Sequence, residues 1–188
     1  IMKYLAFYLK KEVRELSKNN VRLEAIGQIH RLPEAVRNQL EKSKQALDKN
    51  NGLTLILALS YGSRAEIVDA TRAIAEKASS GKIDPQEIDE QLIADHLHTR
   101  HVPDPDLLIR TSGEMRMSNF MLWQCAYTEL WFSPVLWPDF RREHLYEAIK
   151  VYQSRERRFG KTSAQLQSGE EIGSGNGVVR RGGGVTSD

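Results

Sequence analysis

Three side chains that can bind phosphate, Arg110, Arg116 and Ser118, stand within nine residues of one another. Each guanidinium can bind two phosphate oxygens at once and stays charged at any relevant pH. The Ser118 hydroxyl can donate to the same phosphate, and Gly113 gives flexibility to the loop between the two arginines. These residue types at this spacing predict a binding site for a phosphate or a diphosphate.

A simpler interpretation of the same residues stays open. The two arginines could form surface ion pairs with Glu114 and Glu129. Ser118 could be only the N-cap of a helix over SNFMLWQCAY. The two roles of Ser118 are compatible, because phosphate binds well at a helix N-terminus.

The neighbouring segments predict how these side chains are positioned. The apolar run PDLLI before Arg110 is typical of a buried parallel strand, and ligands of open α/β sheets bind beyond the carboxyl ends of such strands. LTLILALSYG is apolar on both faces and therefore predicts a central strand. Asp139 is expected to cap the last helix. The other predicted strands are VRLEAIG and TELWFSPVLW, and the helices are 1–18, EAVRNQLEKSKQALDK, RAEIVDATRAIAEKA, IDEQLIADHL and DFRREHLYEAIKVYQSRERRF. This alternation predicts an α/β fold with a largely parallel sheet flanked by helices.

Length and composition limit the classes of protein that the chain can represent. Its 188 residues suffice for one domain with a core, and its 27 Lys and Arg nearly balance 25 Asp and Glu, so bulk charge gives no support for a nucleic-acid partner. The single cysteine, Cys125, cannot form an internal disulfide and fits a reducing compartment. No apolar run is long enough to span a bilayer. We expect a cytoplasmic protein, which does not exclude contact with a membrane surface.

A long motif resembles a known family. The string DLLIRTSGEMRMSNFMLWQCAYTELWFSPVLWPDF, followed by RERRFG, is similar to the C-terminal half of cis-prenyltransferases, and above all to bacterial undecaprenyl diphosphate synthases. NVRLEAIG and GLTLILALSYGSRAEIV share the resemblance. It implies the cis-prenyltransferase-like α/β fold rather than the all-α fold of trans-prenyltransferases. Residues 1–160 would be the C-terminal portion of that domain, and the Gly- and Ser-rich residues 161–188 a disordered tail.

The resemblance also implies an activity. Such enzymes condense isopentenyl diphosphate with an allylic diphosphate, here expected to be farnesyl diphosphate. The product is a long-chain cis-polyprenyl diphosphate such as undecaprenyl diphosphate, the lipid carrier of cell-wall synthesis. Mg²⁺ is the expected cofactor and a homodimer the expected assembly, with peripheral membrane contact for product release.

The family's functional residues carry over to matching positions. Arg110, Arg116, Met117 and Ser118 would bind the diphosphate of isopentenyl diphosphate, and Glu129 would be a magnesium ligand. Met115 stands where some relatives have a histidine, which removes one candidate metal ligand. The last two site residues, Arg158 and Gly160, match a motif that reaches into the neighbouring subunit's active site.

Two of these roles have plain structural alternatives. Glu129 could form a salt bridge to Arg110 or Arg116. Arg158 could belong to a basic helix C-terminus that complements the helix dipole.

Other patterns in the sequence give weaker evidence for function. Leu53, Leu55 and Leu57 could line a tunnel for the growing hydrocarbon or be ordinary core residues. The spacing of three histidines does not favour a metal site, because they do not share one helix face; they are His96, His98 and His101.

The family's Asp-Gly-Asn-Gly-Arg-Trp motif, whose aspartate helps to bind magnesium, does not occur in these 188 residues. We therefore expect a fragment with no catalytic residue of its own, incomplete and inactive alone. The alternative is a non-catalytic partner subunit of a heteromeric cis-prenyltransferase. Such partners also lack the aspartate motif, but they usually lose the R-T-x-G-E-x-R core that this chain keeps. A nucleotide-binding module is disfavoured, because no Gly-rich phosphate loop is present.

Overall fold

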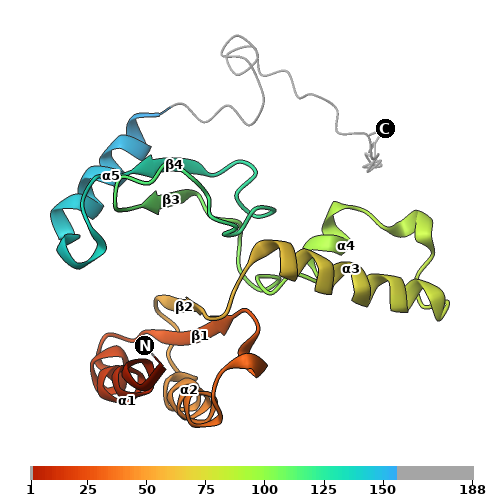
Figure 1. Ribbon diagram of the computed structural model, residues 1–188, viewed down its shortest axis with the longest axis horizontal. Coiled ribbons are helices and arrows are strands. Elements are labelled where there is room, and N and C mark those ends of the chain that lie inside the picture. The colour runs from red at the N-terminus through yellow and green to blue at the C-terminus, as the bar shows by residue number, and fades with distance from the viewer. Residues whose placement is uncertain (1, 156–188) are drawn as a thin grey trace, which may run out of the picture.

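The computed structural model describes residues 2–155, which form an α/β fold of parallel strands and flanking helices (Figure 1). The strands are β1 (Arg22–Ile26), β2 (Thr54–Ala58), β3 (Leu107–Arg110) and β4 (Glu129–Phe132). The α-helices are α1 (Met2–Lys18), α2 (Glu34–Leu47), α3 (Ser63–Ser79), α4 (Glu90–Ala94) and α5 (Arg142–Ser154). Short 3₁₀ turns are η1 (Ile29–Arg31), η2 (Pro85–Glu87) and η3 (Trp137–Asp139). The predicted fold class is confirmed.

The strands form two parallel pairs rather than one continuous sheet within the described residues. β1 pairs with β2, from Arg22 opposite Thr54 onward, and β3 pairs with β4, from Leu107 opposite Glu129 onward. Within residues 2–155, β2 pairs with β1 alone, and Leu55 keeps 38% of its surface exposed. The prediction of a central strand is therefore wrong for this part of the chain. An apolar strand shows that both faces favour burial, but not which segment covers them.

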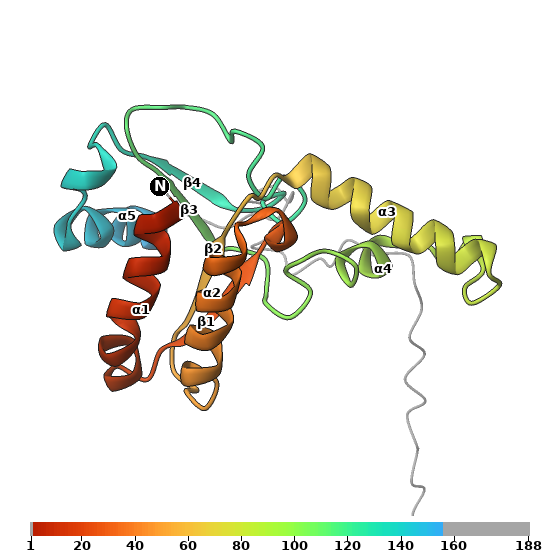
Figure 2. The ribbon, with the colours of Figure 1, turned by 60° about the horizontal axis from the view of Figure 1, so that its bottom comes forward.

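The main core lies between the first strand pair and two helices. α1 and α2 run side by side over one face of β1 and β2 (Figure 2). Leu9 of α1, Leu23 of β1 and two α2 leucines, Leu40 and Leu47, form the buried cluster. Each such side chain contributes about 1.5–3 kcal/mol through burial. The Ser43 hydroxyl, also buried, donates to the Leu9 carbonyl at 3.1 Å and ties the two helices together.

The remaining helices, α3, α4 and α5, lie away from this core. α3 follows β2 and extends outward with the short α4 beside it, while α5 lies next to β3 and β4 (Figures 1 and 2). None of the helices within residues 2–155 combines the length and the apolar character needed to cross a membrane.

The predicted cap of the last helix is wrong. Asp139 ends η3, and α5 begins at Arg142 with Arg141 as the preceding cap residue. The Arg141 backbone N–H donates to His144 Nδ1 at 2.8 Å and is thus satisfied by a side chain of the first turn of α5. Pro138 lies within η3, where its fixed φ favours a separate tight turn before the helix.

Candidate functional site

Arg110 is the last residue of β3 and opens onto a cavity of about 390 Å³ at the carboxyl end of the strand. Arg116, which follows in the next loop, lines the same cavity. Two arginines that stand close in the sequence therefore line one space. The other lining residues are Leu108, Ile109, Thr111, Ser112, Met117, Phe120 and Trp137.

The loop after β3 is fixed against the chain that follows β4. Ser112 and Gly113 both adopt left-handed backbone conformations, with φ of 69° and 67°. The Ser112 N–H donates to the Val135 carbonyl and the Gly113 N–H to the Ser133 carbonyl, each at 2.8 Å. The Ser133 N–H in turn donates to the Arg110 carbonyl at 2.7 Å. These hydrogen bonds thus hold the backbone of Arg110 and of the loop that follows it in place.

Glu114 holds the two arginines together. Its Oε2 lies 3.7 Å from Nη2 of Arg110 and contacts Nη2 of Arg116 as well, as an ion pair without good hydrogen-bond alignment. A guanidinium has five N–H donors, so one contact to Glu114 leaves most of each group free for an anion. The predicted alternative of a pair with Glu114 is confirmed. Phosphate binding by the two arginines stays a prediction.

An aromatic wall borders the cationic part of the cavity. Trp137 stacks on Phe140 with ring centroids 6.1 Å apart and an interplanar angle of 15°. Trp137 remains 72% exposed, so its other face is open to a ligand. With Phe120 and Met117 it gives the cavity an apolar side next to a charged one. Such a combination suits a ligand with a charged head and a hydrocarbon part.

The predicted helix over SNFMLWQCAY does not form. Ser118, Asn119 and Met121 have φ of 50°, 60° and 48°, values that a right-handed helix cannot contain. The segment forms turns instead, with the Phe120 N–H donating to the Met117 carbonyl at 3.1 Å. Ser118 is therefore not a helix N-cap, and it lies between two lining residues without lining the cavity itself. Its role in phosphate binding stays a prediction.

Asn119 is a residue of this loop that the sequence analysis did not single out. It contacts the N-terminus of α3, far away in the chain. The available signal was its residue type, because asparagine tolerates the left-handed conformation better than most residues.

Glu129 lies at the other end of the strand pair. It opens β4 opposite Leu107, whereas Arg110 is opposite Phe132, so about 10 Å of strand separates the two positions. Its Oε2 accepts a hydrogen bond from Nη1 of Arg155 at 2.6 Å. The alternative of a salt bridge from Glu129 to Arg110 or Arg116 is wrong; Arg155 is the partner.

Glu129 offers one carboxylate, which fits the preference of Mg²⁺ for few carboxylates together with phosphate and water. No cluster of three or more His, Cys, Asp or Glu side chains suited to a metal occurs within residues 2–155. The assignment of Glu129 as a magnesium ligand stays a prediction. Arg158 and Gly160 lie outside the described residues.

The histidines and leucines discussed in the sequence analysis do not line this cavity. His98 Nδ1 accepts from the Gly27 N–H at 3.2 Å, whereas His96 contacts Lys77. Leu57 packs against the core of α1 and α2, but Leu53 is 70% exposed.

A second cavity, of about 430 Å³, lies over β1 and α2. Its charges are mixed, and Lys44 is paired with Glu41 at 3.1 Å. It therefore lacks the surplus of positive charge found around Arg110.

Comparison with known proteins gives the family. The prenyltransferase family model described as "Putative undecaprenyl diphosphate synthase" matches residues 1–160. An isoprenyl transferase of Chlorobaculum tepidum is 52% identical over 170 residues, which is 90% of this chain and 64% of that protein. One from Porphyromonas gingivalis is 55% identical over 155 residues, or 82% of this chain and 61% of that protein. The chain thus spans slightly less than two thirds of the length of these relatives.

Solved structures agree with the sequence comparison. Lavandulyl diphosphate synthase from Lavandula x intermedia, in complex with dimethylallyl diphosphate, superposes with a TM-score of 0.83 at 40% identity, covering 85% of this chain and 70% of that one. A probable undecaprenyl diphosphate synthase from Campylobacter jejuni gives a TM-score of 0.72 at 35% identity, covering 85% and 72%. The chain belongs to the undecaprenyl diphosphate synthase family of cis-prenyltransferases.

Proposed function

We propose that this chain acts in isoprenyl chain elongation, in which isopentenyl diphosphate condenses with an allylic diphosphate such as farnesyl diphosphate. The product would be a long-chain cis-polyprenyl diphosphate such as undecaprenyl diphosphate. The observation that carries the proposal is the cavity into which Arg110 and Arg116 face. The neighbouring lavandulyl diphosphate synthase is described in complex with dimethylallyl diphosphate, which supports a prenyl diphosphate as the class of substrate.

Binding and orientation are the contributions that this chain's residues would make. Arg110 and Arg116 would hold the diphosphate of isopentenyl diphosphate, with Met117 and Ser118 beside them. In the reaction the allylic carbon–oxygen bond breaks, the double bond of isopentenyl diphosphate supplies the electron pair of the new carbon–carbon bond, and a proton leaves. Holding both reactants at contact distance removes much of the entropic barrier.

Magnesium, when bound, supplies positive charge that assists departure of the allylic diphosphate. Glu129 is the residue of this chain that we expect to hold it. Its Oε2 already accepts a hydrogen bond from Arg155, so the metal would bind through Oε1, or Arg155 would have to release Oε2. Arg155 also donates to the Leu130 carbonyl at 3.1 Å, which gives it a second anchor if it moves.

We further propose a homodimer in which Arg158 and Gly160 of one copy complete the diphosphate site of the other. Size-exclusion chromatography with light scattering tests the assembly. A monomer at micromolar concentration would contradict it.

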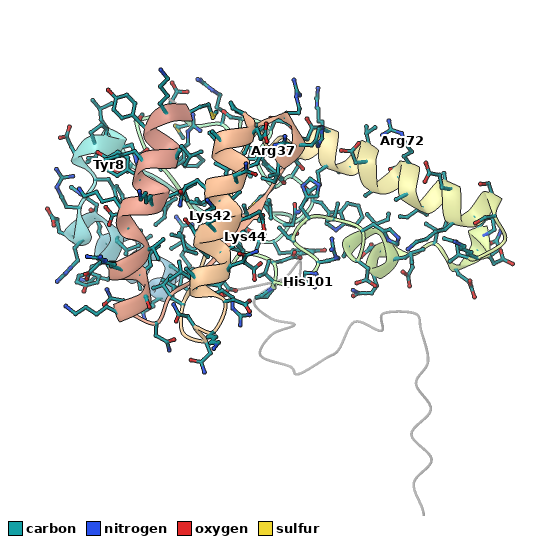
Figure 3. All side chains as sticks on the ribbon, turned by 90° about the horizontal axis from the view of Figure 1, so that it is seen from below. Tyr8, Arg37, Lys42, Lys44, Arg72 and His101 are labelled. Carbon is teal, nitrogen blue, oxygen red and sulfur yellow. The ribbon has the colours of Figure 1, made fainter. Side chains whose placement is uncertain are left out.

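Peripheral membrane contact is proposed for α1. This helix exposes Tyr4, Phe7 and Tyr8, and a shallow cavity beside Phe7 is lined by Lys10, Lys11 and Arg14. In Figure 3 Tyr8 lies on the side of α1 away from α2. Exposed aromatic rings next to cations suit the surface of an anionic bilayer. Co-sedimentation with anionic vesicles, but not with zwitterionic vesicles, is the expected result.

The deciding experiment is calorimetric titration of the chain with isopentenyl diphosphate in magnesium buffer. Arg110→Ala should abolish binding while circular dichroism shows an unchanged fold. Arg72→Ala is the matched control, because Arg72 lies on α3 and pairs with Asp69 at the surface (Figure 3). No binding by a folded parent would overturn the proposal and favour a non-catalytic partner subunit.

A further inference from the structure

Asn119 joins the loop of the diphosphate cavity to the N-terminus of α3. The Arg64 N–H donates to Asn119 Oδ1 at 2.9 Å, and the Ser63 N–H donates to the Asn119 carbonyl, also at 2.9 Å. The residue at the N-cap position of α3 is Gly62, which has no side chain to accept these hydrogen bonds. Asn119, 55 residues from Arg64 in the sequence, therefore caps the helix from another segment.

The contact is reciprocal. The Leu122 N–H donates to Ser63 Oγ at 3.0 Å, and Ser63 is fully buried. A Cβ at Gly62 would lie 2.8 Å from Asn119 Nδ2, so the absence of a side chain there permits the close approach. Phe120 adds an edge-to-face contact with Tyr61, with ring centroids 5.7 Å apart. Residues 119–122 are thus held against α3 by both backbone and side-chain contacts.

The loop needs this support. Left-handed conformations are unfavourable for Ser118 and Met121, and each costs on the order of a few-fold to thirtyfold in population, whereas the asparagine at 119 tolerates this conformation better. The favourable contacts to α3 are what can hold them. Met117 and Phe120, which line the cavity, lie directly on either side of Ser118 and Asn119.

We propose that Asn119 is a positioning residue of the diphosphate site. By capping α3, its side chain fixes the backbone on which Met117 and Phe120 stand, and through Met117 it restricts where Arg116 can place its guanidinium. Asn119 itself does not line the cavity. The identity of the ligand rests on the function proposed above, but the positioning of the loop does not.

Two substitutions separate the side-chain cap from the backbone conformation. Asn119→Gly keeps the left-handed conformation and the backbone carbonyl but removes the Oδ1 acceptor. Asn119→Asp keeps an acceptor, and a negative charge is favourable at a helix N-terminus. Asn20→Gly is the matched control, because Asn20 is also left-handed, at φ 54°, and its Oδ1 accepts from the Asn51 N–H at the far end of β1 and β2.

Amide hydrogen exchange and calorimetric titration with isopentenyl diphosphate form the test. Asn119→Gly should accelerate exchange at Arg64, Phe120 and Leu122 and weaken the affinity for isopentenyl diphosphate about five- to tenfold. Asn119→Asp should restore both properties, and Asn20→Gly should alter neither.

The outcomes are distinct from those that test the proposed function. The inference would be overturned if amide exchange at Phe120 and Leu122 is unchanged in Asn119→Gly, or if the affinity of that variant for isopentenyl diphosphate is unchanged. It would also be overturned if Asn119→Asp loses as much affinity as Asn119→Gly. The folded parent could fail to bind isopentenyl diphosphate while exchange is faster in Asn119→Gly than in the parent and the other variants. That result would overturn the proposed function and leave the positioning role of Asn119 supported.

Discussion

Removing the buried carboxylate of Glu66 should destabilise the fold more than any surface substitution on the same helix. Glu66, on the first turn of α3, is 1% exposed and accepts three hydrogen bonds. Its Oε2 accepts from the Tyr61 hydroxyl at 2.6 Å and from Gln124 Nε2 at 3.2 Å. Its Oε1 accepts from the His98 backbone N–H at 2.8 Å. One side chain thus connects three segments that are far apart in the sequence.

The magnitude follows from the three donors. In Glu66→Ala each donor loses its buried acceptor, at about 1–3 kcal/mol apiece before relaxation. Water entering the vacated space recovers part of this cost, so we expect a loss of about 3–5 kcal/mol in the free energy of unfolding. Glu66→Gln keeps one carbonyl oxygen and should cost less, about 1–2 kcal/mol. Its amide would also meet Gln124, whose own Oε1 has no hydrogen-bond partner and can accept from it.

Urea unfolding followed by circular dichroism measures the difference. With an m-value of about 2 kcal/mol/M, the midpoint of Glu66→Ala should fall by about 1.5–2.5 M. Glu76→Ala, an exposed glutamate on the same helix, should stay within about 0.5 kcal/mol of the parent. A loss below 1 kcal/mol in Glu66→Ala, or a larger loss in Glu66→Gln than in Glu66→Ala, would refute the reasoning.

Four further predictions each concern a single residue. Gly27→Ala should cost about 3 kcal/mol or more in urea unfolding, because φ is +104° and the new Cβ would meet the Leu59 carbonyl oxygen at 2.2 Å. Burial, helped by the neighbouring carboxylate, raises the pKa of the Tyr61 hydroxyl well above its usual value of 10.0. This group therefore stabilises the fold below pH 10, and its contribution is lost as the pH rises further. In Tyr61→Phe the free energy of unfolding should decline less steeply above pH 10. Burial also raises the pKa of the Cys125 thiol, so iodoacetamide at pH 8 should react more slowly with the native chain than with the chain in urea, and equal rates would contradict this. Arg116→Lys should weaken isopentenyl diphosphate binding about five- to tenfold in calorimetry, because an ammonium cannot bind two oxygens as a planar fork does; an unchanged affinity would mean that Arg116 acts as a point charge only.

The strand that carries Arg110 could be predicted because its signal is local. PDLLI is a short apolar run, and the position of an arginine at its end is fixed once the run becomes a strand. The long helices α1, α2 and α3 were predictable for the same reason, since each carries a helical repeat of apolar residues over several turns.

The conformation of residues 118–127 could not be predicted in this way. Their apolar spacing favours a helix, yet hydrogen bonds from Ser63 and Arg64 to Asn119 hold the start of the segment in left-handed conformations. Tertiary contacts therefore outweigh a weak local propensity. Nothing in the segment itself shows that the N-terminus of a distant helix will rest on it.

Distance along the chain was also a poor guide within the site. Glu129 follows the arginine loop closely in sequence, and Arg64 precedes it by a long interval. Parallel pairing nevertheless places Glu129 at the far end of β4 from Arg110, while Arg64 is hydrogen-bonded to the loop of the cavity. Two parallel strands are joined by a crossover of a dozen or more residues that returns the chain to the same edge, so the end of one strand and the start of the next lie at opposite ends of the pair. For this reason the residues predicted to bind diphosphate, which belong to one strand end and its loop, include three that line one cavity within the described chain. A magnesium site built on Glu129 must instead bridge the length of the strand or draw on groups beyond these residues.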